Sequence, residues 1–354
     1  MSSERLSALT GWVVEQLGTK NINIKPLTGD ASFRGYYRLH LLDSESTVTG
    51  AHRTLIVMDA PPPREDTRPF LAVCTMFDQH KVRVPHVLAS DVQQGFMILE
   101  DFGDTVLSQV LDEDNVDQLY SQAMNQLIDL QHAPALDRYP LPAYGEAKLI
   151  DEMNLFDEWF LRKFLMLIPS QEEQTMLMTS FDFLANQALR QPQVVVHRDY
   201  HCRNLMVLDQ SKELGIIDFQ DAVIGPITYD VVSLLRDAYV QWPASSVQDW
   251  LKIYWERQSV RGYLGKTSLA QLQQWFDWMG AQRHLKVLGI FARLYFRDGK
   301  DGYLQNLPLV FFYLLSETKG YNELSALHEW LCERVLPAFL VEVPESMDLL
   351  GEFL

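Results

Sequence analysis

Three side chains that can handle phosphate and metal ions occur in one short segment: Asp199, Asn204 and Asp218. Two apolar runs, residues 194–196 and 214–217, precede the two aspartates and are typical of short buried strands. If these strands pair, the three side chains converge on one point. Carboxylate and amide oxygens suit Mg²⁺, which takes water and phosphate as its other ligands, and a carboxylate beside them can take a proton from a hydroxyl group. The segment therefore predicts the catalytic half of a phosphoryl-transfer site.

The order of these residues supports that interpretation. The string HRD at 197–199, then Asn204, then DF at 218–219 follows the order H-R-D-x-x-x-x-N and D-F of the protein kinases. One alternative is a solvated loop whose acids only cap helices. Zinc is a second alternative, because His197 and His201 lie four residues apart as in zinc proteases. The strand before them, and the absence of a glutamate after His197, favour magnesium.

A literal DFG occurs earlier, at residues 101–103. It precedes the HRD string, whereas the metal-binding tripeptide of kinases follows it. We expect this segment to connect two lobes, where backbone groups from Glu100 to Phe102 could bond to an adenine. Turn formation or helix capping is the alternative role for Asp101 and Asp104.

The phosphate-binding elements of kinases are altered in this chain. In place of G-x-G-x-x-G it has "LTGDASFRGYYRL" at residues 27–39, and we assign four residues of this loop to nucleotide binding. They are Gly29, Ser32, Phe33 and Arg34. Small residues let the backbone approach phosphates, although an ordinary hairpin is the alternative.

The lysine of the kinase V-A-I-K strand is also missing. Met58 stands at its position, within a strand-like run at 54–60, and we assign it to the nucleotide site. Arg34 or Arg38 is then expected to supply the cation for the nucleotide phosphates. The alternative is that these arginines only lie on an exposed face of a strand.

The surrounding pattern predicts an α+β, bilobal, protein-kinase-like fold. Residues 1–103 read as a small β-rich lobe that binds nucleotide, and residues 104–354 as a larger helical lobe with the catalytic loop and the substrate side. Strands are expected at 33–42, 54–60, 84–91 and 95–101, and helices at 6–17, from about 66, and at 116–131, 151–167, 171–190, 229–239, 247–257, 269–296 and from 307. Gly289 weakens the prediction of one continuous helix at 269–296.

Composition restricts the classes of partner. The 354 residues include 47 acidic and 30 basic side chains, a net charge of −17 that disfavours binding to nucleic acid or anionic lipid. No apolar stretch approaches a membrane span, and no signal peptide is visible at the N-terminus. Three scattered cysteines fit a cytoplasmic protein. Few residues separate Asp218 from the next predicted helix, so an activation loop is absent and a small-molecule substrate is expected.

Taken together, these residues resemble the aminoglycoside phosphotransferase and choline kinase-like superfamily. More narrowly, the strings "TGDASFRGYYRL", "VMDAPPPREDTRPF", "GFMILEDFGD", "VVHRDYHCRNLM" and "RLYFRDGKDGYLQNLP" are similar to bacterial cell-wall-recycling kinases. Those kinases phosphorylate the anomeric hydroxyl of N-acetylmuramate and N-acetylglucosamine. The resemblance covers nearly the whole chain and implies a cytoplasmic, ATP- and Mg²⁺-dependent phosphotransferase that acts on an alcohol group.

The resemblance also implies roles for single residues. Asp199 would be the base, and Asn204 and Asp218 would hold Mg²⁺. Candidates for the sugar side are Asp221, Arg236, Asp237, Arg297 and Lys300, each with a surface salt bridge as its alternative role. Two other functions stay open: a kinase for an aminoglycoside or amino alcohol, and a nucleotide-binding pseudokinase, which only the missing lysine supports.

Overall fold

Two units make up the chain in the computed structural model, which describes residues 3–27, 33–42, 54–62, 64–134, 136, 138–208 and 213–354. Unit 1 comprises Met1–Val110, Ala133–Pro140 and Arg203–Asp221, and unit 2 comprises Leu111–His132, Leu141–Cys202 and Ala222–Leu354. The segment that carries Asp199 therefore belongs to unit 2, whereas Asn204 and Asp218 belong to unit 1. The predicted division into residues 1–103 and 104–354 stays a prediction.

The described residues of unit 1 form a five-stranded antiparallel sheet in the order β1-β2-β3-β5-β4. Its strands are β1 (Ile22–Pro26), β2 (Gly35–Leu41), β3 (Thr54–Asp59), β4 (Val87–Asp91) and β5 (Phe96–Glu100). Alternation along β3 sends Leu55 and Val57 to one face and Ile56 and Met58 to the other. The two faces consequently serve different purposes.

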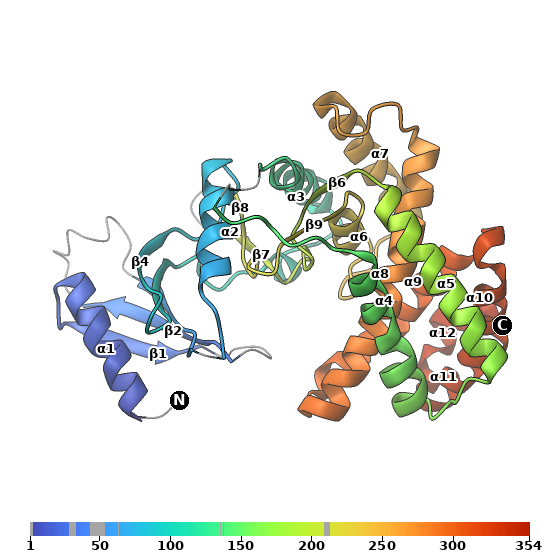
Figure 1. Cartoon of the computed structure of the whole chain (residues 1–354), viewed down its shortest axis with the longest axis horizontal. Helices are drawn as coiled ribbons and strands as arrows, with labels where there is room; N and C mark the ends of the chain where they lie inside the picture. The colour runs from blue at the N-terminus through green and yellow to red at the C-terminus, as the bar shows by residue number, and fades with distance from the viewer. Residues whose placement is uncertain are drawn as a thin grey trace. The chain divides into compact units, whose positions relative to one another are not determined.

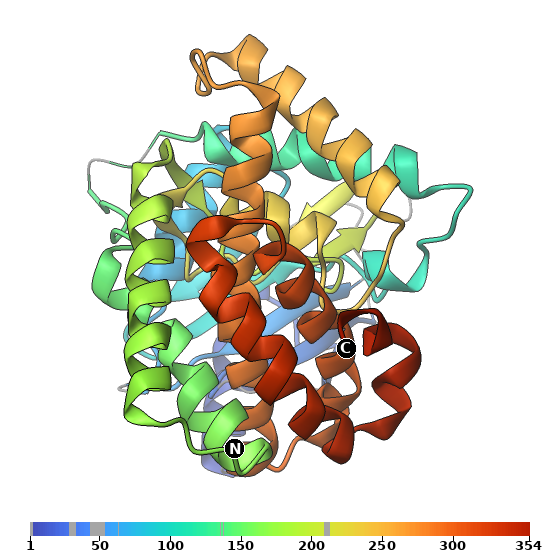
Figure 2. The same ribbon diagram turned by 90° about the vertical axis from the view of Figure 1, so that its right-hand side faces the viewer.

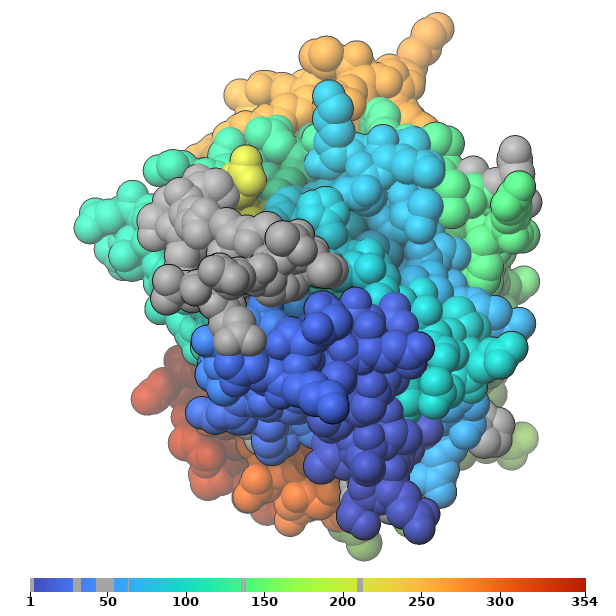
Figure 3. Space-filling view, turned by 90° about the vertical axis from the view of Figure 1, so that its left-hand side faces the viewer, coloured from blue at the N-terminus to red at the C-terminus, as the bar shows by residue number. Residues whose placement is uncertain are grey.

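Helix α1 (Ser3–Leu17) covers the first face. Its apolar stripe, which includes Leu9 and Val13, packs on Leu55, Val57 and other core residues of the sheet. Figure 3 shows this helix, in dark blue, at the surface of unit 1. Removing these side chains from water stabilises the sheet, since burying a leucine or valine contributes roughly 1.5–3 kcal/mol.

Unit 1 also contains α2 (Arg68–Gln79) and a two-stranded hairpin of β7 (Leu205–Val207) and β8 (Leu214–Ile216). Residues of the other sheet face, of α2 and of the hairpin line one pocket. The hairpin joins unit 1 through backbone bonds: the Ile216 amide donates to the Arg83 carbonyl (2.8 Å) and the Val207 amide to the Thr105 carbonyl (2.8 Å). A segment far along the sequence is thereby built into the N-terminal unit.

Unit 2 is mainly helical, with one two-stranded sheet of β6 (Gln193–Val196) and β9 (Val223–Pro226). Its described helices are α3 (Val116–Gln131), α4 (Glu146–Leu155) with a π-helical continuation (Phe156–Phe164), α5 (Gln171–Arg190), α6 (Tyr229–Leu235), α7 (Ala244–Arg261), α8 (Leu269–Asp298), α9 (Leu307–Thr318), α10 (Ser325–Trp330) with a π-helical turn (Leu331–Val335), α11 (Leu336–Glu342) and α12 (Met347–Leu350). Short 3₁₀ segments are Leu107–Gln109 in unit 1 and, in unit 2, Asp301–Asn306, Asn322–Leu324, Pro344–Ser346 and Gly351–Phe353. Helix α8 packs against α4, α5, α6 and α9, and Figure 2 shows it in orange behind the red C-terminal helices, with green α5 to one side.

These elements confirm the predicted α+β fold, with a sheet-based N-terminal unit and a helical remainder. Helices α3 and α5 have the predicted bounds, whereas the predicted helix 229–239 ends at Leu235. In the described residues, no helix combines the length and the apolar character that crossing a membrane requires.

The doubt that Gly289 raised about a continuous helix was wrong, because α8 runs through it without a break. A Cβ at this position would lie 2.3 Å from the backbone carbon of Leu155 in α4. The glycine therefore allows two helices to approach closely, and close packing accounts for its presence inside a helix.

Gly289→Ala should destabilise unit 2 by about 1–3 kcal/mol, since backbone atoms cannot move aside for the new methyl group. The matched control is Gly11→Ala in α1, where a Cβ would meet nothing within 4 Å. That change should leave stability unchanged or raise it by up to about 1 kcal/mol, the helix propensity of alanine. Urea unfolding followed by circular dichroism measures both. Equal effects of the two substitutions would refute the close-packing explanation.

Candidate active site

The loop after β6 carries the HRD string and is held by buried carboxylates of unit 2. The backbone amides of His197 and Arg198 donate hydrogen bonds to Asp230 of α6, at 2.7 and 3.0 Å. Arg198 adopts a positive φ of 81°, a strained backbone conformation for a residue other than glycine. The Asp199 amide donates to His197 Nδ1 (3.2 Å). Asp230 and His197 therefore hold the turn that presents Asp199.

A second aspartate holds the far end of the loop. The Cys202 amide donates to Asp237 Oδ2 (2.8 Å), and the Tyr239 amide donates to Oδ1 of the same carboxylate (3.0 Å). Both carboxylate oxygens of Asp237 thus accept backbone hydrogen bonds. Asp237 is buried and supports the loop. A contact between Asp237 and the sugar stays a prediction.

Asp199 is half-buried. Partial removal from water would raise the pKa of its carboxyl, but the positive charge of Lys286, helped by His201 and Arg283, lowers that pKa to about 2. Both basic residues come from α8, and each is itself buried and partnered: Lys286 Nζ donates to Tyr229 (2.8 Å) and lies 3.1 Å from Glu152, while Arg283 donates to Ser233 (2.6 Å). At neutral pH the site therefore contains a carboxylate that can accept a proton.

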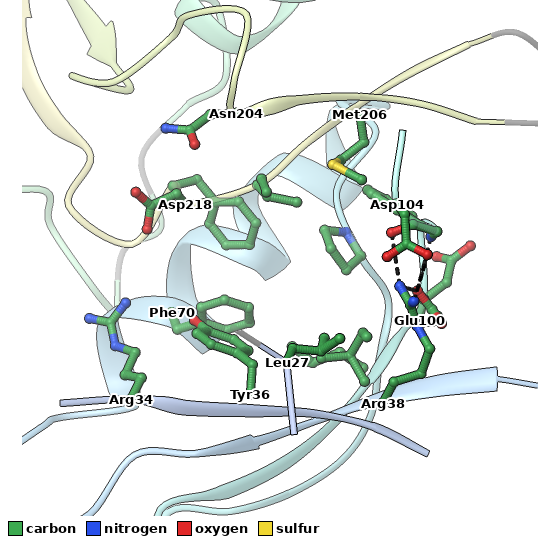
Figure 4. A pocket seen from close by; sticks show the side chains of 18 residues that line it. Leu27, Arg34, Tyr36, Arg38, Phe70, Glu100, Asp104, Asn204, Met206 and Asp218 are labelled. Atoms are coloured by element: carbon green, nitrogen blue, oxygen red, sulfur yellow. Dashed lines mark hydrogen bonds and ion pairs between the residues drawn. The ribbon is translucent and has the colours of Figure 1, made fainter. Parts of the chain in front are cut away.

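Unit 1 contains a pocket of about 470 Å³. Its walls are Leu27, Arg34, Tyr36, Arg38, Ile56, Phe70, Pro85, Leu99, Glu100, Asp101, Phe102, Gly103, Asp104, Asn204, Met206, Ile217, Asp218 and Phe219. Figure 4 shows Arg34, Asn204 and Asp218 toward one end and Arg38, Glu100 and Asp104 toward the other, with apolar side chains between them. The apolar middle suits the faces of a flat base, the backbone at the Glu100 end can bond to the edge of that base, and the polar Asp218 end suits phosphates.

The local structure around Asn204 and Asp218 explains how two separated residues reach the same end. The Ile217 amide, just before Asp218, donates to the Asn204 carbonyl (3.1 Å). Asp218 has a positive φ of 64°, which turns the chain sharply after β8. The next residue, Phe219, is buried against Phe70 and Phe77 of α2. These contacts hold the turn, and one oxygen of Asp218 accepts a hydrogen bond from Gln220 (2.7 Å).

The other end of the pocket is the DFG segment, and Arg38 is tied to it. Its guanidinium donates to Asp101 (2.7 Å), Asp104 (2.7 Å) and the Gly103 carbonyl (3.0 Å). Asp101 also accepts from the Gly103 amide (2.9 Å), which is the turn-forming role considered for it. Of the two arginines predicted to meet the phosphates, Arg38 is thus engaged at the opposite end.

Glu100 and Phe102 in the same segment are fixed by packing. Glu100 is buried and forms an ion pair with Arg83. Burial alone would raise the pKa of its carboxyl, but hydrogen bonds, chiefly the one from Arg83, lower it. The Phe102 ring lies so close to Gly215 of β8 that a Cβ there would be 2.4 Å from it. The backbone from Glu100 to Phe102 therefore has little freedom, as expected for a surface that receives a flat base.

Arg34 directly precedes β2 and lies at the Asp218 end of the pocket. Its Nε lies 3.1 Å from Glu65 Oε2, and both side chains are largely buried. Burial works against the charge, but nearby Tyr36, Glu65 and Asp221 raise the pKa of Arg34. The Asp218 end of the pocket thus has an arginine–glutamate pair, whereas kinases use a β3 lysine paired with a glutamate.

Met58 lies on the same sheet face as the pocket residue Ile56 but is itself outside the pocket lining, with 1% of its surface exposed. Its role in nucleotide binding stays a prediction. Phe33 is exposed, and the Arg64 guanidinium lies 5.4 Å from its ring centre. Gly29 and Ser32 lie outside the described residues.

The predicted sugar-side residues fall in different environments. Asp221 is exposed in unit 1. Arg236 lies among the buried charges of unit 2, where it pairs with Asp277 (2.7 Å) and Glu317 (2.9 Å). Arg297 is half exposed and pairs with its neighbour Asp298 (2.9 Å), and Lys300 follows the end of α8. The salt-bridge alternative therefore accounts for Arg236 and Arg297, and sugar contacts of all four stay predictions.

Sequence reasoning missed the side chains that support these groups. Tyr36, Glu65 and Phe70 at the pocket, and Glu152, Arg283 and Lys286 around Asp199, were not singled out. The basic residues of α8 left a detectable signal, since Arg283, Lys286 and Arg293 recur at spacings of three and seven on an otherwise apolar helix.

The sequence profile described as "Phosphotransferase enzyme family" matches residues 23–263. Among curated proteins, an N-acetylmuramate/N-acetylglucosamine kinase of Pseudomonas aeruginosa is 42% identical over 306 residues, which span 86% of this chain and 87% of that protein. A protein of the same name from Pseudomonas putida is 38% identical and covers 93% of this chain and 96% of its own length.

Solved structures share the fold at low sequence identity. A choline kinase from Cryptosporidium parvum aligns with a TM-score of 0.62 and 12% identity, over 92% of this chain and 99% of that one. An ADP-bound aminoglycoside phosphotransferase aligns with a TM-score of 0.57 and 14% identity, over 88% and 97%. These likenesses confirm the kinase-like fold.

Arg34→Met should raise the KM for ATP by about tenfold or more, because it removes a largely buried cation at the Asp218 end of the pocket. The matched control is Arg68→Met, which removes an arginine from an exposed pair with Asp66 nearby in the sequence. Steady-state kinetics with varied ATP measure both. An unchanged KM in Arg34→Met, or the same rise in Arg68→Met, would exclude Arg34 as the phosphate cation.

Proposed function

Because the chain belongs to the phosphotransferase enzyme family, we propose that it transfers the γ-phosphoryl group of ATP to the anomeric hydroxyl of N-acetylmuramate and N-acetylglucosamine. One observation carries the catalytic part of this proposal: a half-buried carboxylate, Asp199, whose pKa is held at about 2 by the basic residues of α8. The choice of sugar is supported by the names of relatives that are 38–42% identical over most of their length.

ATP fits the pocket of unit 1 from end to end. Its adenine would lie against the backbone at Glu100 and Phe102, and its phosphates would lie toward Arg34. Asn204 and Asp218 at that same end offer amide and carboxylate oxygens, a donor set that fits Mg²⁺ together with phosphate oxygens and water. The bound ion would neutralise charge that develops on the transferred group.

Asp199 acts as the base in this proposal. An anomeric hydroxyl is more acidic than an ordinary alcohol, and proton removal comes late in a loose transition state. A carboxylate of low pKa can therefore orient the hydroxyl, accept its proton and leave the oxygen to attack phosphorus in line with the departing ADP. Because ATP is the donor, we place the reaction in the cytoplasm.

Asp199→Asn keeps the size of the side chain and removes the base, so kcat should fall by a factor on the order of 10²–10⁴. ATP binding, measured by calorimetry, should persist because the pocket lies in unit 1. Asp182→Asn on the exposed face of α5 is the control and should keep full activity. Retention of more than about half of the wild-type kcat in Asp199→Asn would remove Asp199 from the chemistry.

Methyl glycosides provide a test of the acceptor atom. They block the anomeric oxygen and leave the other hydroxyls free, so coupled-assay turnover should fall to background with the methyl glycoside of N-acetylglucosamine. The free sugar is the control in the same assay. Phosphorylation of the glycoside at a comparable rate would assign the reaction to another hydroxyl and contradict anomeric transfer.

A further inference from the structure

One face of α8 carries four basic residues: Arg283, Lys286, Arg293 and Arg297. At 3.6 residues per turn they fall within an arc of about 80° around the helix axis. Lys286 and Arg293 are two turns apart, or about 10 Å along the axis. A line of like charges on one face of a largely buried helix is costly unless anions meet it.

The first two residues of this line already have such partners. Lys286 is close to Glu152 and to the phenol of Tyr229, and Arg283 bonds to Ser233. Together they oppose the negative charge of Asp199. This half of the line is therefore accounted for by the catalytic carboxylate and its surroundings.

Arg293 differs from its neighbours. Its Nε is buried and has no hydrogen-bond partner, and within the described part of the chain no carboxylate forms an ion pair with its guanidinium. Burial and the positive charge of Arg297 lower the pKa of Arg293. Asp298, Glu158 and Glu152 act in the opposite direction, but their effects are smaller. The position thus holds a partly buried cation in surroundings that lack a matching anion.

Arg297, one turn further on, is a useful contrast. It lies on the same face, but it is half exposed and already bonded to Asp298 through two nitrogens, both at 2.9 Å. Among these four residues, Arg293 is the one whose charge is left without a partner in the described structure.

We propose that Arg293 binds the carboxylate of an acidic amino-sugar substrate, two helical turns from the residue that faces the catalytic base. This inference rests on the proposed function. N-acetylmuramate differs from N-acetylglucosamine by an ether-linked acid, and a sugar ring with such an arm is comparable in length to the spacing between Lys286 and Arg293. An arginine fork pairs with a carboxylate through two hydrogen bonds. Arg293 is then a specificity residue for the acidic sugar, and the neutral sugar binds without it.

The test compares the two sugars in Arg293→Met, Arg293→Lys and, as the control, Arg334→Met. For Arg293→Met, kcat/KM for N-acetylmuramate should fall about 10–100-fold, mainly through KM, the effect of losing a charge-assisted pair. The value for N-acetylglucosamine should stay within about twofold, since that sugar has no carboxylate. Arg293→Lys should restore part of the loss, because it returns the charge without the fork. Arg334→Met removes a half-exposed arginine that pairs with Glu173 (2.7 Å), and it should change neither sugar by more than about twofold.

Other outcomes overturn the assignment. Equal losses for both sugars in Arg293→Met would mean a structural role, and an equal selective loss in Arg334→Met would mean an effect of total positive charge and not of one arginine. If the wild-type protein phosphorylates neither sugar, the proposed function fails. Calorimetry then decides the present inference separately: N-acetylmuramate should bind the wild-type protein more tightly than N-acetylglucosamine, and Arg293→Met should remove the difference. Equal binding of both sugars by the wild-type protein would refute it.

Discussion

A half-buried carboxylate that must stay ionised is the constraint on which the rest of unit 2 depends. Removal from water favours the neutral form of Asp199, and the positive charge of nearby basic residues reverses that preference. Helix α8 provides this charge through Arg283 and Lys286, and it can approach closely because Gly289 allows contact with the backbone of α4. Glu152 and Tyr229 then partner Lys286, so that the cation is not left alone. The close packing of α8 on α4 therefore also provides the positive charge that keeps Asp199 ionised.

Unit 1 meets the opposite requirement, which is to hold the negative charge of phosphates in a chain with a strong excess of acids. One face of its sheet is buried under α1, and residues of the other face line the pocket. In our proposal Arg34, which precedes β2 and pairs with Glu65, supplies the charge that a β3 lysine supplies in kinases. The missing lysine is therefore weak support for a pseudokinase, because a different residue can supply the same charge at the same end of the pocket.

Local patterns in the sequence predicted much of this arrangement. Apolar periodicity marked α3 and α5 to the residue, and the order of HRD, Asn204 and DF identified both strand ends that carry polar side chains. What periodicity could not predict are contacts between distant segments. The clamp of Arg38 on Asp101 spans 63 positions, and Glu152 meets Arg198 and Lys286 from another helix. A buried ion pair has no signature in either of its two local sequences, so Arg38 was a reasonable candidate for the phosphates until its partners were known.

The central claim is phosphoryl transfer from ATP to the anomeric oxygen of an N-acetylated amino sugar. Phosphorus NMR of the product made from ATP and N-acetylmuramate tests it most directly, because scalar coupling identifies the carbon that carries the new phosphate. Transfer to the anomeric oxygen predicts one new phosphate signal, which is split by the single anomeric proton and grows at the same rate as ADP. A signal coupled instead to the methylene protons at carbon 6, or ADP release without any sugar phosphate, would contradict it.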